Sequence, residues 1–256
     1  MNDRRNIKLL IAYDGTDFCG WQRQENRPAH SSLRTVQGEI EGALQKMHRE
    51  PVTLTGSGRT DSGVHAVGQA ANFFTGIQSI PAERFVPALN SLLPHDVRIL
   101  SAEEAPAGFH ARFDAVMRTY RYHFISGRPM LPHECRYNLH LYHYPNIQTL
   151  NAYGRLLLGE TDCTMFAGAG DKSKSMFRYI SGAHFFVENN RLIFEISANA
   201  FLWKMVRSVA GTFLHYEESS VSSTELAKII ARKDRSLSGP TLPPQGLFLW
   251  KVDFKI

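Results

Sequence analysis

The sequence predicts an α+β protein made of two similar halves. In residues 1–106, strand and amphipathic-helix patterns follow the order strand, helix, strand-loop-strand, helix, strand, which suits a ferredoxin-like unit. Residues 107–256 show a similar order of strands and helices, although no repeat of residue identity is detectable. A chain of 256 residues with 43% hydrophobic residues can bury a substantial core. We therefore expect two α+β halves that face a shared cleft.

Besides the strand-loop-strand, four patterns predict the elements of the first half. Alternating apolar residues indicate a half-buried strand over residues 7–13, which ends at an Asp-Gly turn. Apolar residues at helical spacing indicate an amphipathic helix over residues 35–47. Two prolines frame a short helix at residues 81–92, and residues 97–100 form the closing strand. The segment SAEEAPAG, residues 101–108, has the small, acidic and Pro/Gly-containing composition of a domain boundary.

The second half begins with a predicted strand over residues 117–125, and one face of this strand is aromatic. Asn146 precedes a helix that ends before Gly159, and residues 177–198 have the pattern of a β hairpin. The alternating residues 248–254 predict the last strand.

The helix predicted from Leu202 to about Tyr216 is apolar around most of its circumference, so it should be deeply packed. Its polar residues Lys204, Arg207, Ser208 and Gly211 follow helical spacing and form one narrow stripe. A buried Arg207 would need a partner, because an unpaired buried charge costs several kcal/mol, roughly, even after relaxation. In the alternative, the stripe faces solvent and Arg207 lies in water.

Composition limits the classes of partner. Lys and Arg number 29 against 24 Asp and Glu, which gives a net charge of +5 and favours a polyanionic partner. No apolar run reaches membrane-spanning length, so we expect a soluble, cytoplasmic protein. The three cysteines are far apart and indicate reduced thiols. The cluster His133, Cys135, His140 and His143 matches no standard zinc spacing, so we predict exposed strand histidines and no metal site.

The stretch GSGRTDSGVHAVGQAANFF, residues 56–74, combines a glycine-rich loop with strand patterns on both sides. Its glycines permit positive φ angles or a close backbone approach, and Arg59 and Asp61 lie between them. A nucleotide-binding P-loop is excluded, because Val64 and His65 stand where its Lys and Ser/Thr belong. Asp61 is then either a residue that closes the loop on its own amides or a carboxylate aimed at a ligand.

Several separated motifs resemble one family. The strings GRTDSGVHA and GQAANF are similar to the signature of the tRNA pseudouridine synthase A family. The similarity continues in order through the strings YDGTDFCGWQRQ, NSLLPHDVRIL, FHARFDA, RTYRYHF, FLWKMVRSVAG, KDRSLSG and QGLFL. Cys163 and Asn72 depart from the family pattern, which often has Phe and His at these places, and the segment FAGAGDKSK also differs.

The resemblance implies a fold and an activity. The family isomerises uridine to pseudouridine at positions 38, 39 and 40 of the tRNA anticodon stem-loop, as a homodimer without cofactor or required metal. Its pseudouridine synthase fold combines two ferredoxin-like or RRM-like halves in a mostly antiparallel eight-stranded sheet flanked by helices, with the active-site cleft between the halves.

The resemblance also implies residue roles. Asp61 would be the catalytic residue, Tyr120 would stack on the uracil, and Arg207 would hold Asp61 ionised and oriented. Arg59 would occupy the space of the flipped base. The residues expected to meet tRNA phosphates are His110, Arg112, Arg128, Lys172 and Lys174.

Two alternatives to this isomerase remain open. A non-catalytic, basic RNA-binding module could make the same phosphate contacts without chemistry. A base hydrolase could share base flipping and the carboxylate, but it would release free uracil.

Overall fold

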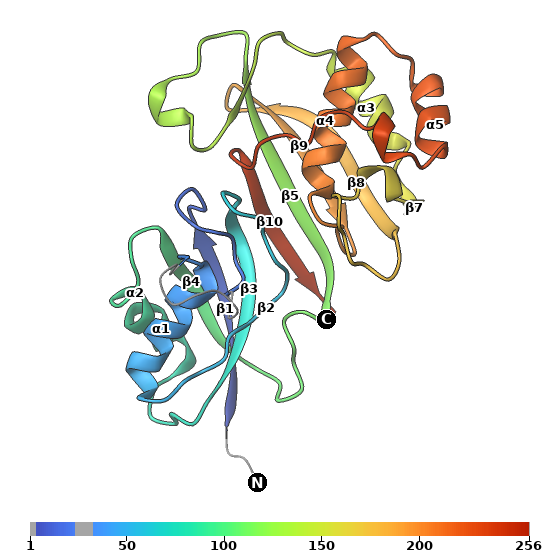
Figure 1. Ribbon diagram of the computed structural model, residues 1–256. Helices are drawn as coiled ribbons and strands as arrows, with labels where there is room; N and C mark the ends of the chain where they lie inside the picture. Colours follow the sequence, from blue (N-terminus) through green and yellow to red (C-terminus); the bar gives the residue numbers. More distant parts are fainter. Residues whose placement is uncertain (1–3, 24–32, 256) are drawn as a thin grey trace. The chain divides into compact units, whose positions relative to one another are not determined.

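The computed structural model describes residues 4–23 and 33–255 (Figure 1). The chain divides into two compact units, unit 1 with residues 1–116 and 248–256 and unit 2 with residues 117–247. In both units helices flank a mostly antiparallel sheet, so the predicted α+β class is confirmed. No helix in the described part of the chain is long and apolar enough to span a membrane.

The sheet of unit 1 has the strand order β4-β1-β3-β10. Its strands are β1 (Arg5–Tyr13), β2 (Thr55–Gly56), β3 (His65–Thr75), β4 (Val97–Ala105) and β10 (Leu247–Phe254). The pairs of β1 with β3 and β4 are antiparallel, β10 is parallel to β3, and the short β2 also pairs with β3. The helices are α1 (Val36–His48), α2 (Phe85–Asn90) and the one-turn 3₁₀ helix η1 (Ala82–Arg84). In Figure 1, α1 and α2 lie together beside this sheet.

The core of unit 1 confirms the strand predicted over residues 7–13 and the amphipathic helix predicted over residues 35–47. On β1 the alternating residues Ile7, Leu9 and Ile11 are fully buried, and on α1 so are Val36, Ile40 and Leu44. Helix α1 begins where Thr35 accepts a hydrogen bond from Gly38 N, which satisfies one of the otherwise unpaired amides at the helix start.

The expected domain boundary at residues 101–108 is wrong for most of its length. Strand β4 continues to Ala105 and pairs with β1. The acidic residues that gave the segment its linker-like composition form ion pairs across this pair of strands, Glu103 with Lys8 at 2.8 Å and Glu104 with Arg5 at 3.2 Å. The compact units therefore differ from the expected halves, residues 1–106 and 107–256. The last strand belongs with unit 1, because it pairs with β3.

The sheet of unit 2 has the strand order β5-β9-β8-β7. Its strands are β5 (Ala115–Ser126), β6 (Leu139–Leu141), β7 (Gly159–Asp162), β8 (Phe177–Glu188) and β9 (Arg191–Ala198). Strand β6 is parallel to β5, and the other pairs are antiparallel. The helices are α3 (Ile147–Arg155), α4 (Met205–Glu218) and α5 (Ser223–Ala231), with 3₁₀ turns η2 (Pro132–Glu134), η3 (Thr164–Phe166) and η4 (Arg235–Leu237).

Local signals in the second half are confirmed where they depend on caps and turns. Asn146 accepts a hydrogen bond from Thr149 N at the start of α3, and Gly159 has the positive φ of 88° that its position required. Asn189 and Asn190 turn the β8–β9 hairpin with φ of 50° and 60°. The segment that carries His133, Cys135, His140 and His143 is expected to be a strand, but it contains only the turn η2 and the three-residue β6.

Candidate active site

The loop that joins β2 to β3, residues 57–64, is called the glycine loop here. Its first part is attached to β3: Ser57 N donates to Ala70 O, and Ser57 Oγ donates to Gln69 Oε1 at 2.6 Å. Gln69 is fully buried, and its Nε2 donates to Gly58 O at 3.0 Å. The buried amide therefore fixes the course of the loop before it reaches Arg59.

A second loop, residues 14–22, lies against the glycine loop and is called the cradle loop. Trp21 N donates to Thr60 O at 3.2 Å, and the Tyr13 hydroxyl contacts Thr60 Oγ1 at 2.8 Å. Gly20 has a φ of 88°, and a Cβ at this position would lie 2.6 Å from Thr60 O. Only glycine permits this approach, so the residue before Asp61 is held by close backbone contact.

The residues after Asp61 are held by one carbonyl of the cradle loop. Phe18 O accepts hydrogen bonds from Gly63 N at 3.3 Å and from Ser62 Oγ at 3.1 Å. Val64 N donates to Asp61 O at 3.2 Å, which closes a turn that begins at Asp61. The backbone is therefore fixed on both sides of Asp61, while its side chain is partly exposed. Such a site can present a carboxylate from a preorganised backbone.

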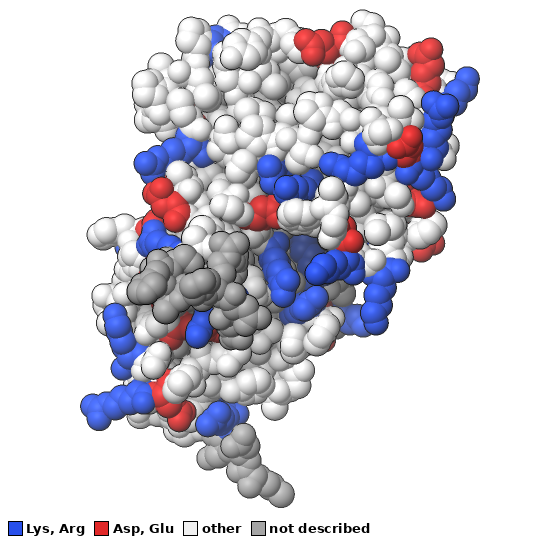
Figure 2. All heavy atoms as spheres, in the orientation of Figure 1, with Lys and Arg blue, Asp and Glu red and all other residues white. Residues whose placement is uncertain are grey.

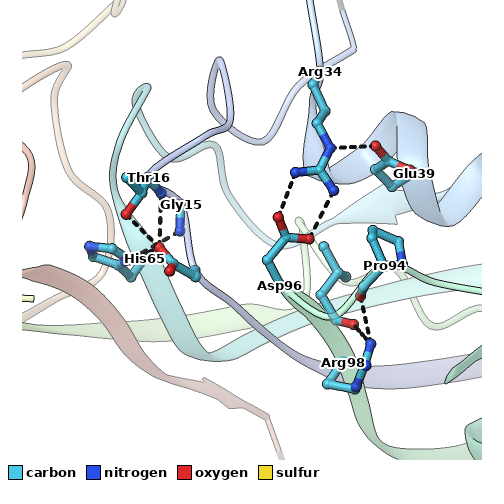
Figure 3. Close-up of polar contacts among 10 residues, drawn as sticks. Gly15, Thr16, Arg34, Glu39, His65, Pro94, Asp96 and Arg98 are labelled. Carbon is cyan, nitrogen blue, oxygen red and sulfur yellow. Dashed lines mark hydrogen bonds and ion pairs between the residues drawn. The ribbon is translucent and has the colours of Figure 1, made fainter. Parts of the chain in front are cut away.

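Phe18 is in turn held by Arg34, whose contacts with Asp96 and Glu39 are drawn in Figure 3. The Arg34 guanidinium makes a two-point contact with Asp96, whose NH2–Oδ1 distance is 2.9 Å, and its Nε donates to Glu39 at 2.7 Å. The hydrogen bonds to Asp96 raise the pKa of Arg34 above its usual range. The guanidinium carbon lies 4.2 Å from the centre of the buried Phe18 ring. Arg34 thus connects the cradle loop to α1 and to the residue before β4.

His65 ties the other end of the cradle loop to β3. The ring is fully buried, and its Nδ1 accepts from Gly15 N at 3.0 Å (Figure 3). The ring also stacks on Phe248, with 4.7 Å between the ring centres. A Cβ on Gly15 would lie 2.0 Å from Val64 O. The sequence excluded a nucleotide loop on the basis of His65 but gave no sign of this supporting contact.

Arg59 lies on the same loop as Asp61, two residues earlier. Its side chain is exposed, and its Nε donates to Gln22 Oε1 of the cradle loop at 3.1 Å. The glycine loop therefore carries both the candidate carboxylate and the candidate cation.

Two other candidates lie in unit 2. Tyr120 is a partly exposed residue of β5, and its ring meets Phe201 edge-to-face at 5.1 Å. Arg207 lies in α4, and its Nε donates to Leu242 O at 2.6 Å while Leu242 N donates to Arg207 O. The side chain is partly buried, and its carbonyl contact fixes its direction.

The polar stripe on α4 does not face solvent as a whole. Ser208 is fully buried, and a Cβ on Gly211 would lie 1.9 Å from Pro240 O. Thr212 Oγ1, also on α4, accepts from Gly239 N at 3.0 Å. The solvent-facing alternative is therefore wrong for these residues, because the segment around residues 239–242 packs on the stripe.

The predicted phosphate contacts have different surroundings. His110 Nδ1 accepts from the backbone of Arg112 at 3.2 Å and of Phe113 at 3.3 Å, so this nitrogen is used within the turn. Arg112 is exposed. Arg128 forms a two-point pair with Glu134 at 2.7 and 2.8 Å, and this pair lowers the pKa of Glu134 to about 2.

Lys172 and Lys174 are exposed in the loop between β7 and β8. Asp171 holds this loop directly before Lys172, because its Oδ1 accepts from Ser173 N at 2.7 Å and its Oδ2 accepts from Trp203 N. The two lysines are thus carried by an anchored loop. Figure 2 shows more Lys and Arg than Asp and Glu side chains on the visible face.

Within residues 4–23 and 33–255, no three His, Cys, Asp or Glu side chains are placed to hold a metal ion. In the histidine-rich segment, His140 Nε2 contacts Arg128 O at 3.0 Å, and the exposed His143 lies 3.5 Å from Glu217. Only His140 of these histidines lies in a strand.

The fold and the glycine loop define an α+β protein that presents a carboxylate and a guanidinium from one supported loop. A family model described as tRNA pseudouridine synthase matches residues 9–114 and 154–255. The chain therefore belongs to the tRNA pseudouridine synthase family, and the resemblance found in the sequence is confirmed.

Individual relatives match the chain over nearly its full length. A protein named tRNA pseudouridine synthase A from Treponema denticola is 53% identical over 252 residues, which cover 98% of this chain and 94% of the relative. The protein of that name from Treponema pallidum (strain Nichols) is 53% identical over 94% of this chain and 85% of its own length. The one from Caldicellulosiruptor saccharolyticus is 41% identical over 97% and 99%.

Proposed function

We propose that this protein is a tRNA pseudouridine synthase, an isomerase that converts uridine to pseudouridine within tRNA. The observation that carries the proposal is Asp61, whose backbone is held on both sides by Thr60, Ser62 and Gly63 while its side chain remains partly exposed. Family membership supports the same activity. By resemblance, the target uridines are those at positions 38, 39 and 40 in the anticodon stem-loop.

The chemistry relinks one base to its own ribose. The bond from C1′ to N1 of uracil breaks, the base turns, and a bond from C1′ to C5 forms. C5 loses a proton and N1 gains one, so the atoms balance without an external donor. Asp61 acts at the ribose, either as a nucleophile at C1′ or as a base at C2′. In either role a carboxylate on a preorganised backbone avoids much of the entropic cost of orientation.

The target base must leave its stack before it can turn, which costs a few kcal/mol, roughly. Arg59 would fill the space that the base leaves, because its guanidinium is planar, exposed and on the same loop as Asp61. Tyr120 would stack on the extruded uracil and accept the proton from C5. The edge-on contact with Phe201 supports this role by fixing the orientation of the Tyr120 ring.

The pairing of Asp61 with Arg207 stays a prediction, since the two residues belong to different compact units. A double-mutant cycle tests it. If the pair forms, Arg207→Gln slows turnover in the parent protein but has little further effect in the Asp61→Asn background. Independent effects would contradict the pairing.

The phosphate contacts follow from exposure and charge. Lys172, Lys174, Arg112 and Arg128 are exposed cations among these candidates, and His110 would use Nε2 because Nδ1 accepts backbone hydrogen bonds. Arg128 would have to share its guanidinium with Glu134. Lys172→Ala should therefore weaken tRNA binding and reduce its salt dependence more than Arg128→Ala does. The reverse order would contradict this assignment.

We also propose a homodimer that acts in the cytoplasm. The family resemblance motivates both statements, and a tRNA arm is large compared with a single small cleft. Light scattering at micromolar concentration tests the assembly, and a monomeric mass would contradict it.

The decisive experiment incubates the purified protein with an unmodified tRNA transcript and measures two products. Pseudouridine mapped at positions 38–40, with no release of uracil, is the expected result. Free uracil would indicate the base hydrolase, and tRNA binding without either product would indicate the RNA-binding module.

A further inference from the structure

Arg59 lies at the surface, and its side chain contacts Gln22 among the residues that the structure describes. Its Nε donates to Gln22 Oε1 at 3.1 Å, and the guanidinium itself is exposed. A long, exposed arginine normally samples many rotamers, so a defined acceptor at this place restricts a residue that would otherwise be mobile. The question is what holds that acceptor in position.

The Gln22 amide is oriented by a second glutamine. Its Nε2 donates to Gln37 Oε1 at 2.7 Å, and the same oxygen accepts from Arg23 N at 3.0 Å. Because Gln37 presents an acceptor, Gln22 must direct its amide nitrogen inward. Its oxygen is then directed outward, toward Arg59.

The orientation of Gln37 is fixed from the other side. Its Nε2 donates to the Leu54 carbonyl at 3.0 Å and to Glu41 Oε1 at 3.0 Å. A backbone carbonyl can only accept, so the contacting atom of Gln37 must be its nitrogen. Gln37 is 8% exposed, and a reversed amide would leave two buried acceptors facing its oxygen.

Glu41 anchors this series of contacts. It is 9% exposed, its Oε1 accepts from Leu54 N at 3.0 Å, and its Oε2 lies 3.3 Å from the Arg23 guanidinium. The donor and the acceptor of every hydrogen bond from Glu41 through Gln37 to Gln22 are therefore determined. The acceptor at the end of this series, Gln22 Oε1, points at Arg59. We call Gln22, Gln37 and Glu41 the amide relay.

We propose that the amide relay holds the Arg59 side chain against Gln22 in the free enzyme, with Gln22 as the positioning residue. We call this position of Arg59 the parked position. This inference rests on the proposed function, in which Arg59 leaves its contact to fill the space of the flipped base. A hydrogen bond to one neutral acceptor at an exposed site is weak, so Arg59 can leave Gln22 when tRNA is bound. Parking keeps the guanidinium beside the glycine loop and lowers the entropy that must be lost when it enters the stack.

The first test is a double-mutant cycle on single-turnover pseudouridine formation with saturating tRNA. Gln22→Met keeps the length of the side chain and removes the acceptor. We expect a three- to ten-fold lower rate, with tRNA affinity within two-fold of the parent. In the Arg59→Ala background, Gln22→Met should cause no further loss, because the relay then has nothing to position. Gln45→Met, on the exposed side of the same helix as Gln37, is the matched control and should leave the rate unchanged.

The second test observes Arg59 directly and needs no activity. In a ¹⁵N spectrum of the free protein, the Arg59 Nε–H signal, assigned by its absence in Arg59→Ala, should be protected from solvent exchange. Gln22→Met should remove this protection, while Gln45→Met should not. An unprotected Arg59 signal in the parent, or additive rate effects in the cycle, would overturn the parked position. A parent that makes no pseudouridine but retains the protected signal would refute the proposed function and leave the parking intact.

Discussion

Arg34 offers a direct test of how the site is supported, because its described side-chain contacts are with Phe18 of the cradle loop, Asp96 and Glu39. Arg34→Ala removes the two-point contact with Asp96, the hydrogen bond to Glu39 and the cover of the Phe18 ring. A hydrogen bond to a charged group contributes about 1.5–3 kcal/mol when buried, and an exposed ion pair about 1 kcal/mol or less. The Arg34 side chain is 33% exposed, between these limits. We expect a loss of about 2–3 kcal/mol in the free energy of unfolding.

The effect on turnover should exceed the effect on binding. When Phe18 loses its cover, its carbonyl is no longer held where Ser62 and Gly63 donate to it. A displacement of about 1 Å at a reacting group can cost about 100-fold in rate. We expect Arg34→Ala to lower the single-turnover rate by about 10-fold or more, with tRNA affinity within two-fold. Rates are measured well below the unfolding temperature, so that the folded population stays complete.

Arg5→Ala is the matched control for stability. Arg5 also contacts a carboxylate, Glu104, at 3.2 Å, and it donates to the carbonyls of Ile77 and Ile80 near the opposite end of β1. Its loss should lower stability by a similar amount without changing the rate. If Arg34→Ala is destabilised to the same degree but retains the parent rate, the contacts of Arg34 with Phe18, Asp96 and Glu39 do not position the glycine loop.

Three further predictions concern the backbone, pH and thiol reactivity. Gly15→Ala should lower the free energy of unfolding by about 1–3 kcal/mol, since its Cβ would meet the backbone at Val64. The control Gly42→Ala has open space at its position, so urea unfolding should show no loss of stability. The ion pair with Lys233 lowers the pKa of Asp162 to about 2. The stabilisation that this pair gives the folded protein is therefore present above about pH 4 and lost toward pH 2. Asp162→Asn should be less stable than the parent at pH 6 but nearly equal to it at pH 2. Burial raises the pKa of Cys163 to about 12, so a thiol reagent at pH 8 should label Cys135 in the folded protein and Cys163 only after unfolding; equal labelling rates would contradict its burial.

The elements that could be predicted from the sequence are those with local causes. Strand β1 follows from alternation, α1 from helical spacing, and the β8–β9 hairpin from the strand patterns of residues 177–198. The end of β4 could not be predicted in this way. Its acidic residues have a linker-like composition, and only their cross-strand partners on β1 reveal a strand.

The candidate site shows the same division. The glycine loop, Arg59 and Asp61 stand out in one short stretch of sequence, and the family resemblance adds their roles. The contacts that support the site cannot be recognised in the sequence, because Arg34, His65 and Gln37 contact residues that lie far away along the chain. A buried Gln or His between apolar neighbours gives no local sign of the partner that it will contact. The parallel pairing of β10 with β3 is equally non-local.

The measurement that tests the central claim most directly is pseudouridine formation by Asp61→Asn. The amide has nearly the shape of the carboxylate, and the turn at this position is closed by the Asp61 backbone carbonyl, so the loop should keep its conformation. An amide can serve neither as the nucleophile nor as the base, so the single-turnover rate on unmodified tRNA should fall by at least ~10³-fold. The free energy of unfolding and the tRNA affinity should stay close to those of the parent, except that the free energy of unfolding should fall by roughly 1–3 kcal/mol if the proposed pair of Asp61 with Arg207 is lost. A well-folded Asp61→Asn protein that still forms pseudouridine within a few-fold of the parent rate would contradict the catalytic role of Asp61.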